Sequence, residues 1–239
     1  MYADDLILVC ASLSHLQALV NICVNEFSYM GLAVNAKKCG LLRVGKKWSA
    51  ECAKLFINDS ALSKAKELRC MGVYLQSGNV LKFNVEYCKK KFYRAVNAIL
   101  SCVGNKADIV VTLCNAQCLP ILLYCSESMS MTKTEKCKLA HPYYRLFSKL
   151  FHTFNATIIK ECQWYLNCLP PQYLVDLRTL KFYNKFQSIG NRILNILFKA
   201  TGVAATALIY DRLNIIRDSK KSWRSCAWTL FSQSLGLTC

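Results

Sequence analysis

Acidic residues are scarce in this chain, and their scarcity sets its charge. Asp and Glu number 14 among 239 residues, whereas Lys and Arg number 31, so the formal net charge at pH 7 is +17. A surplus of positive charge of this size favours a polyanionic partner, most simply nucleic acid. An anionic membrane surface attracts basic segments by the same electrostatics and is the competing class of partner.

Long apolar runs and a secretory leader are also missing. Runs such as 119–125, which contains Pro120, fall short of the ~20 apolar residues that a membrane-spanning helix needs. The first residues are acidic, without the basic stretch that opens a signal peptide. We therefore expect an intracellular protein, cytoplasmic and/or nuclear, without a membrane partner. Hydrophobic residues make up 54% of the chain, so a folded core is expected rather than wholesale disorder.

Paired metal-binding cysteines and common catalytic signatures are absent too. There is no CxxC pair and there are only three histidines, so we favour no zinc site at Cys114-x3-Cys118 or Cys137-x3-His141. The 15 cysteines are scattered and odd in number, which excludes a complete disulfide framework and favours reduced thiols in an apolar core. No disulfide-linked partner is expected. The GxxxxGK[ST], GxSxG and HExxH motifs do not occur.

Two adjacent carboxylates stand near the start of the chain. Tyr2 and Ala3 precede Asp4 and Asp5, and the apolar run 6–10 follows them as an expected buried strand. Crowded carboxylates raise each other's pKa, and a divalent cation removes that penalty. Mg²⁺ is usually held by one or two carboxylates together with substrate phosphates, so this pair predicts half of a two-metal site. The alternative is an Asp-Asp turn that carries no chemistry.

Four short segments follow one another in a distinctive order. They are YADD at 2–5, GLAVNAKKC at 31–39, ELRCMGVYL at 67–75 and LPILLYCSE at 119–127. In the same order, they resemble the YADD box, the GLxxNxxKC motif, the KYLGVxL strand pair and the LPxLLYGSE segment of LINE-type (non-LTR) retrotransposon reverse transcriptases. The resemblance implies an RNA-directed DNA polymerase that uses Mg²⁺, or Mn²⁺ in its place. It also implies an RNA template and a DNA primer as partners, and deoxynucleotides as substrates of the intact enzyme.

The resemblance also assigns roles to individual residues. Asp4 and Asp5 would be catalytic metal ligands, and Lys38 would give a proton to the departing pyrophosphate. Gly72 lies in the segment that resembles the primer grip, where we expect it in mid-strand and open to close approach by another backbone. For Gly72 the alternative is an ordinary hairpin kink. Cys125 stands where the family usually has glycine. For Lys38 the alternative is a solvated lysine on a turn.

A basic helix is expected immediately after these strands. Apolar residues spaced by three and four predict a helix over 85–102. Its cationic residues are interleaved with Phe92 and Tyr93, and they are Lys89, Lys90, Lys91 and Arg94. Such a face can follow a phosphate backbone, and in the family this helix opens the thumb that holds the template–primer duplex. The alternative is a solvated face without a partner.

Local signals predict the elements around the GLxxNxxKC segment. A helix over 16–27 would begin at a cap formed by Ser12 or Ser14 and end at Gly31. Asn35 would hydrogen-bond the loop backbone. Short strands are expected over 32–35, 40–44 and 55–57.

Helices are expected through the rest of the chain. Asp108 would cap a helix that leads to segment 119–127, and Pro142 would kink a helix over 139–151. A long helical segment is expected over 172–199, followed by a weakly helical tail that contains Trp223 and Trp228.

These patterns together predict an α+β protein in three parts. Residues 1–76 would be a truncated antiparallel palm, 77–132 the thumb helices and 133–239 a helical C-terminal region. In the family the YADD box lies at the tip of a hairpin, and the first strand of that hairpin would precede Met1. We therefore expect a fragment without polymerase activity by itself. A non-catalytic, basic nucleic-acid-binding remnant is the alternative.

Overall fold

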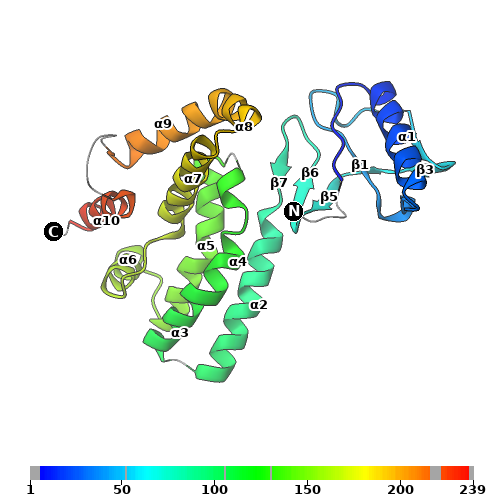
Figure 1. Cartoon of the computed structure of the whole chain (residues 1–239). Coiled ribbons are helices and arrows are strands. Elements are labelled where there is room, and N and C mark those ends of the chain that lie inside the picture. Colours follow the sequence, from blue (N-terminus) through cyan, green and yellow to red (C-terminus); the bar gives the residue numbers. More distant parts are fainter. Residues whose placement is uncertain (1–5, 52, 105, 130, 216–221, 237–239) are drawn as a thin grey trace. The chain divides into compact units, whose positions relative to one another are not determined.

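The computed structural model describes residues 6–51, 53–104, 106–129, 131–215 and 222–236. They form a mixed fold of many helices and small sheets, which confirms the α+β class (Figure 1). The chain divides into two compact units, called unit 1 up to Val85 and unit 2 from Glu86 onward. The identity of the small sheets as part of a polymerase palm remains a prediction.

Unit 1 begins with a helix whose two ends follow the sequence signals. The helix α1 (Leu13–Tyr29) starts at Ser12, whose side chain accepts a backbone N–H from the first turn. Gly31 adopts the left-handed conformation with φ +72°, and the N–H of Leu32 donates to the carbonyl of Phe27 at 2.8 Å. This pattern closes the last turn as a Schellman motif. The predicted start and end of the helix are confirmed.

Three small sheets make up the rest of unit 1. The strands are β1 (Leu41–Leu42), β2 (Leu55–Ile57), β3 (Ser60–Leu62), β4 (Lys64–Ala65), β5 (Glu67–Cys70), β6 (Val73–Gln76) and β7 (Lys82–Phe83). β1 pairs with β4 in parallel, β2 and β3 form an antiparallel hairpin, and β5, β6 and β7 form an antiparallel sheet in that order. The strand expected over 55–57 is confirmed as β2.

The core of unit 1 is small, and a polar side chain of α1 adds hydrogen bonds to the edge of β2 beside it. Its buried members are Val20, Leu41, Leu55, Ile57 and Leu62. The amide of Gln17 donates to the carbonyl of Phe56 at 2.9 Å and accepts its N–H at 2.8 Å. Gln17 thereby replaces a neighbouring strand at the edge of β2 and attaches α1 to it.

Two expected strands of unit 1 do not form. Residues 6–10 have no regular structure, and Leu6, Ile7 and Val9 are 57%, 54% and 84% exposed. An apolar run becomes a strand only when a neighbour takes up its hydrogen bonds, and no strand within the described residues pairs with this one. Residues 32–35 are likewise irregular, and the strand expected over 40–44 shortens to β1.

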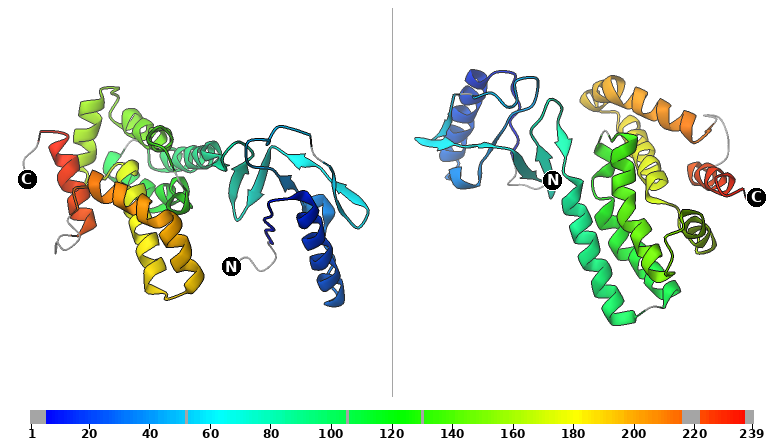
Figure 2. Two further views of the ribbon diagram at one scale, coloured as in Figure 1. Left: turned by 90° about the horizontal axis from the view of Figure 1, so that it is seen from above. Right: turned by 180° about the vertical axis from the view of Figure 1, so that it is seen from behind.

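All regular secondary structure among the described residues of unit 2 is helical (Figures 1 and 2). Its first helices are α2 (Val85–Val103), α3 (Ala107–Leu113), η2 (Cys114–Cys118), α4 (Leu119–Leu122), η3 (Ser126–Ser128) and α5 (Lys133–Leu150). Then follow α6 (Ala156–Tyr165), α7 (Pro171–Ser188), α8 (Arg192–Leu197), η4 (Phe198–Gly202), α9 (Val203–Arg212) and α10 (Trp223–Gln233). The helix expected over 85–102 is confirmed as α2.

The C-terminal helices share one hydrophobic core. Its buried residues come from the loop before α7, from α7, from the end of α9 with the residues after it, and from α10: Leu169, Leu177, Leu180, Ile209, Leu213, Ile215, Cys226, Ala227 and Phe231. The indole N–H of Trp164 donates to the hydroxyl of Ser232 at 3.0 Å, which ties α6 to α10. The tail expected to be only weakly helical is therefore a structural helix of this core.

Three boundaries of unit 2 differ from expectation. The helix expected over 172–199 breaks after α7, because Gly190 is left-handed with φ +67° and the side chain of Asn191 caps α8. Asp108 does not cap α3 but lies in its first turn, where a carboxylate favours the helix dipole. α5 begins at Lys133 rather than near 139, and it runs without interruption through Pro142.

One helical segment is apolar on its exposed side. The continuous stretch Arg192–Arg212 has 21 residues and contains an 18-residue window with a mean hydropathy of 1.6, which makes it long and apolar enough to cross a membrane by length and composition alone. Its large exposed side chains are Ile193, Ile196, Leu197, Val203 and Leu208. A search for unbroken apolar runs misses this segment, because Asn195 and Lys199 interrupt it.

Candidate nucleic-acid interface

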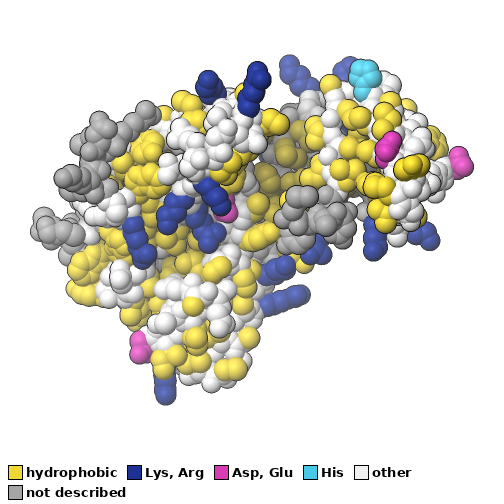
Figure 3. All heavy atoms as spheres, in the orientation of Figure 1, with side chains coloured by type: hydrophobic (Ala, Val, Ile, Leu, Met, Phe, Trp, Pro, Cys, Tyr) yellow, Lys and Arg dark blue, Asp and Glu magenta, His cyan; other side chains and the backbone are white. Residues whose placement is uncertain are grey.

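The helix α2 separates an apolar side from a cationic side. Phe92 and Val96 are buried at 0% and 4% exposure. Lys90, Lys91 and Arg94 are exposed, and no described acidic residue lies within ion-pair distance of them. Residues three and four apart are neighbours on a helix, so these three cations form one patch, called here the basic face. Figure 3 shows Lys and Arg side chains projecting beside α2.

The fourth predicted cation of this helix is engaged locally. The ammonium of Lys89 lies 2.7 Å from a carboxylate oxygen of Glu86, and its side chain is only 18% exposed. Lys91, in contrast, lies over the ring of Tyr87 at 4.8 Å from its centroid, which orients the ammonium by a cation–π contact. The predicted group of four is therefore three exposed cations with Lys89 beside them.

Gly72 lies in a hairpin turn and not in mid-strand, so the expected position is wrong and the alternative of a hairpin kink is the one observed. Cys70 pairs with Val73, so Met71 and Gly72 are the two loop residues of the hairpin β5–β6. Their φ angles are +47° and +80°. Tight hairpins favour turns with two positive φ angles because these match the strand twist, and glycine adopts them without strain. Gly72 thus has a structural reason to be glycine.

The GLxxNxxKC segment forms a capped turn. The side chain of Asn35 accepts the backbone N–H of Lys37 at 3.0 Å, as predicted. This hydrogen bond starts the short helix η1 (Ala36–Lys38), which places Lys38 on an exposed turn. The Lys38 side chain has no hydrogen bond or ion pair with another described residue, and its role as a proton donor stays a prediction.

The carboxylates Asp4 and Asp5 lie outside the described residues. Across the part of the chain that the structure describes, no group of three or more His, Cys, Asp or Glu side chains is placed to hold a metal ion. Two further aspartates have local roles, since Asp59 lies in the β2–β3 turn at φ +62° and Asp108 in the first turn of α3.

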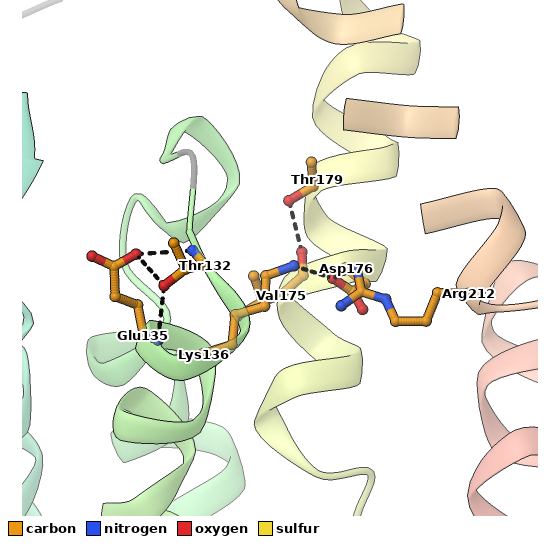
Figure 4. A network of polar contacts seen from close by, with 7 residues as sticks. All are labelled: Thr132, Glu135, Lys136, Val175, Asp176, Thr179 and Arg212. Carbon is orange, nitrogen blue, oxygen red and sulfur yellow. Dashed lines mark hydrogen bonds and ion pairs between the residues drawn. The ribbon is translucent and has the colours of Figure 1, made fainter. Parts of the chain in front are cut away.

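Asp176 is the exception, because it is buried at the centre of unit 2. It is 2% exposed, and its carboxylate oxygen lies 2.7 Å from the ammonium of Lys136 and 2.8 Å from the guanidinium of Arg212 (Figure 4). The three residues come from α7, α5 and α9, so the network joins three helices. Its partners are 40 and 36 residues away in sequence, and no local sequence pattern predicts these ion pairs.

The segment that resembles LPxLLYGSE forms a turn fixed to α7. Cys125, at the position where the family has glycine, is left-handed with φ +61°. The carbonyl of Leu123 accepts hydrogen bonds from the hydroxyl of Ser126 and from the guanidinium of Arg178, each at 2.9 Å. Arg178 also lies 3.7 Å from Glu127. The turn needs an unusual backbone conformation, which explains why glycine suits this position.

The cysteines of the described residues are free thiols. Burial, reinforced by the neighbouring Cys118, raises the pKa of the Cys114 thiol to about 12. Burial likewise raises the pKa of Tyr143, whose hydroxyl donates to Asn115 at 2.6 Å. Metals and electrophiles react with thiolates, so a thiol held protonated at neutral pH acts as a core residue here.

Comparison with known proteins adds no relative. No family model matches the chain, and neither a curated protein nor a solved structure matches it.

Proposed function

We propose that this chain is part of a LINE-type reverse transcriptase and that unit 2 contributes to holding the template–primer duplex. The observation that carries the proposal is the basic face of α2, where Lys90, Lys91 and Arg94 are exposed while Phe92 and Val96 are buried. The order of the four motifs supports the family. The position of the basic helix supports it as well, because this helix follows the KYLGVxL-like hairpin, where the thumb is expected.

Electrostatics explain how such a face holds a duplex. Each phosphate that a lysine or arginine neutralises releases condensed counterions, so affinity falls with salt at a log–log slope of about −0.9 per phosphate on B-form DNA. Three exposed cations within five residues of one helix, each neutralising one phosphate, therefore contribute a slope of about −2.7. Such contacts are made to the phosphate backbone and do not read the bases, so duplex binding is expected with little sequence preference.

Asp4 and Asp5 would hold Mg²⁺ or Mn²⁺, and the metal would stabilise the negative charge that develops during phosphoryl transfer. Two-metal phosphoryl transfer needs carboxylates that converge from separate elements. Asp176 does not supply a further carboxylate, since it is buried and already pairs with Lys136 and Arg212. We therefore propose that this chain alone binds nucleic acid without extending a primer. A non-catalytic nucleic-acid-binding remnant is the second candidate, and the same basic face supports it.

The test compares two charge-reversed triple variants of the full chain. Lys90→Glu, Lys91→Glu and Arg94→Glu together should weaken duplex binding. The log–log slope of affinity against salt should become less steep by about the contribution of three phosphates. Lys133→Glu, Lys138→Glu and Lys149→Glu are the matched control, because these exposed lysines of α5 give the same change in net charge. Equal loss in both variants would show attraction by net charge alone and would contradict a specific face.

A primer-extension assay separates the two candidates. The reverse-transcriptase candidate predicts no extension by this chain, but Mg²⁺-dependent extension once upstream coding sequence is joined. That activity should disappear with Asp4→Ala and Asp5→Ala. No activity in any extended protein, together with duplex binding, would favour the non-catalytic remnant.

A further inference from the structure

Unit 2 contains a cavity that is lined by none of the residues of the basic face of α2. Its volume is about 600 Å³, within the range typical of ligand-binding pockets. Its walls come from the η2–α4 segment, from the middle of α7 and from the start of α10. These three segments lie far apart in the sequence and meet only in the fold.

The lining of the cavity combines apolar and cationic side chains. Pro120 and leucines from 119–123 and from α7 contribute the apolar part, and Arg178, Lys181 and Arg224 contribute the cations. None of the lining residues is acidic. Lys181 and Arg224 are exposed, and neither has an ion pair with a described acidic residue. Figure 3 shows Lys and Arg side chains gathered over the part of unit 2 around α7.

Two of the lining side chains are held in place before any ligand arrives. Arg178 donates to the carbonyl of Leu123 at 2.9 Å, which anchors its guanidinium at the cavity wall. Trp223 is the first residue of α10, directly after the capping residue Ser222, and its ring meets Tyr210 edge-on at 6.5 Å. Side chains that are already ordered lose less entropy on binding, so their contacts contribute more to affinity.

We propose that this cavity binds one nucleotide unit of a single-stranded nucleic acid. The base would lie against the indole of Trp223 and the apolar side chains of the lining, and its phosphates would face Arg178, Lys181 and Arg224. Aromatic rings stack on any base, and arginine and lysine hold phosphates, so the lining fits this ligand class. The identification of nucleic acid as the ligand rests on the proposed function, but the cavity and the basic face of α2 are separate sites.

The experiment follows tryptophan fluorescence of the full chain during titration with oligouridylate of about ten nucleotides, the size range of single-strand sites. A parallel titration uses uridine triphosphate, which distinguishes a free nucleotide from a strand as the source of the same chemistry. Trp223→Leu should remove most of the quenching and weaken oligouridylate binding about fivefold or more, as expected for one lost stack. Trp223 also packs against the core, so its substitution can disturb folding. The second variant is therefore Lys181→Ala with Arg224→Ala, whose side chains are both exposed.

The controls make the outcomes distinct. Lys133→Ala with Lys138→Ala removes the same charge from α5 and should leave oligouridylate binding within about twofold of the unaltered chain. Saturable quenching by either uridine ligand that both cavity variants weaken supports the site. Equal binding by the unaltered chain, the cavity variants and the control overturns it, as does equal loss in the control. Duplex binding that depends on α2 would survive that result, so failure here leaves the proposed function standing.

Discussion

The buried carboxylate of Asp176 lies 2.7 Å from the ammonium of Lys136, and this contact joins the first turn of α5 to the N-terminal half of α7. The side chain of Lys136 is 12% exposed and that of Asp176 is 3% exposed, so both charges have left most of their water. Arg212 approaches the same oxygen from α9 at 2.8 Å, with 44% of its side chain exposed. The capping box of Thr132 and Glu135 sets the start of α5 one turn before Lys136 (Figure 4).

Asp176→Ala should destabilise the chain strongly. The change leaves the buried ammonium of Lys136 without its counter-ion, and breaking a buried pair in this way costs about 3–5 kcal/mol. Arg212→Ala should cost less, because Lys136 still pairs with the carboxylate and Arg212 is half exposed. Urea unfolding followed by circular dichroism gives both values. Asp211→Ala, an exposed neighbour on α9, is the control and should change stability by less than about 0.5 kcal/mol.

Cys125→Gly should stabilise unit 2. A left-handed residue with a Cβ carries a penalty of about 1–2 kcal/mol, of which the greater freedom of glycine in the unfolded chain cancels a part. We expect a net gain of about 0.5–1 kcal/mol in thermal or urea unfolding.

Cys125→Ala separates backbone strain from the thiol contact. Alanine keeps the strain at φ +61° but loses the 3.1 Å contact between the Cys125 thiol and the Ser128 hydroxyl. If both variants lose stability equally, that contact outweighs the strain and the prediction is wrong.

The stability of the chain should fall in alkali partly through Cys114. Folding raises the pKa of this thiol from 9.0 to about 12. Between these values the folded state binds more protons than the unfolded state, so the free energy of unfolding decreases as pH rises. Cys114→Ala should make the dependence less steep in urea titrations at successive pH values across this window, whereas Cys102→Ala, at an exposed thiol, should not.

Single substitutions on α2 should rank its cations by exposure. Lys90→Ala should reduce the salt slope of duplex binding by about one phosphate. Lys89→Ala should reduce it by less, because Lys89 lies 2.7 Å from Glu86 with its side chain 18% exposed. Fluorescence anisotropy at a series of salt concentrations measures both slopes, and a larger effect at Lys89 would contradict the assignment of the basic face.

Local signals were sufficient for much of the helical structure. Ser12 and Gly31 mark the two ends of α1, and the spacing of Phe92 and Val96 marks the buried side of α2. Such signals act within one or two turns, where a cap or a helical period needs no distant partner. The break at Gly190 and Asn191 had the same kind of signal, but the apolar pattern that continues past it obscured it.

Features that depend on distant partners were beyond such signals. Residues 6–10 are apolar enough for a strand, yet they remain irregular because a strand also needs a neighbour to bond with. Asp176 meets Lys136 and Arg212 across separations of 40 and 36 residues. The cavity likewise forms only where α4, α7 and α10 come together. Composition and periodicity indicate which side of its own helix or strand a residue occupies. Ion pairs and cavities depend instead on which elements are brought together, and that is decided by the packing of the whole unit.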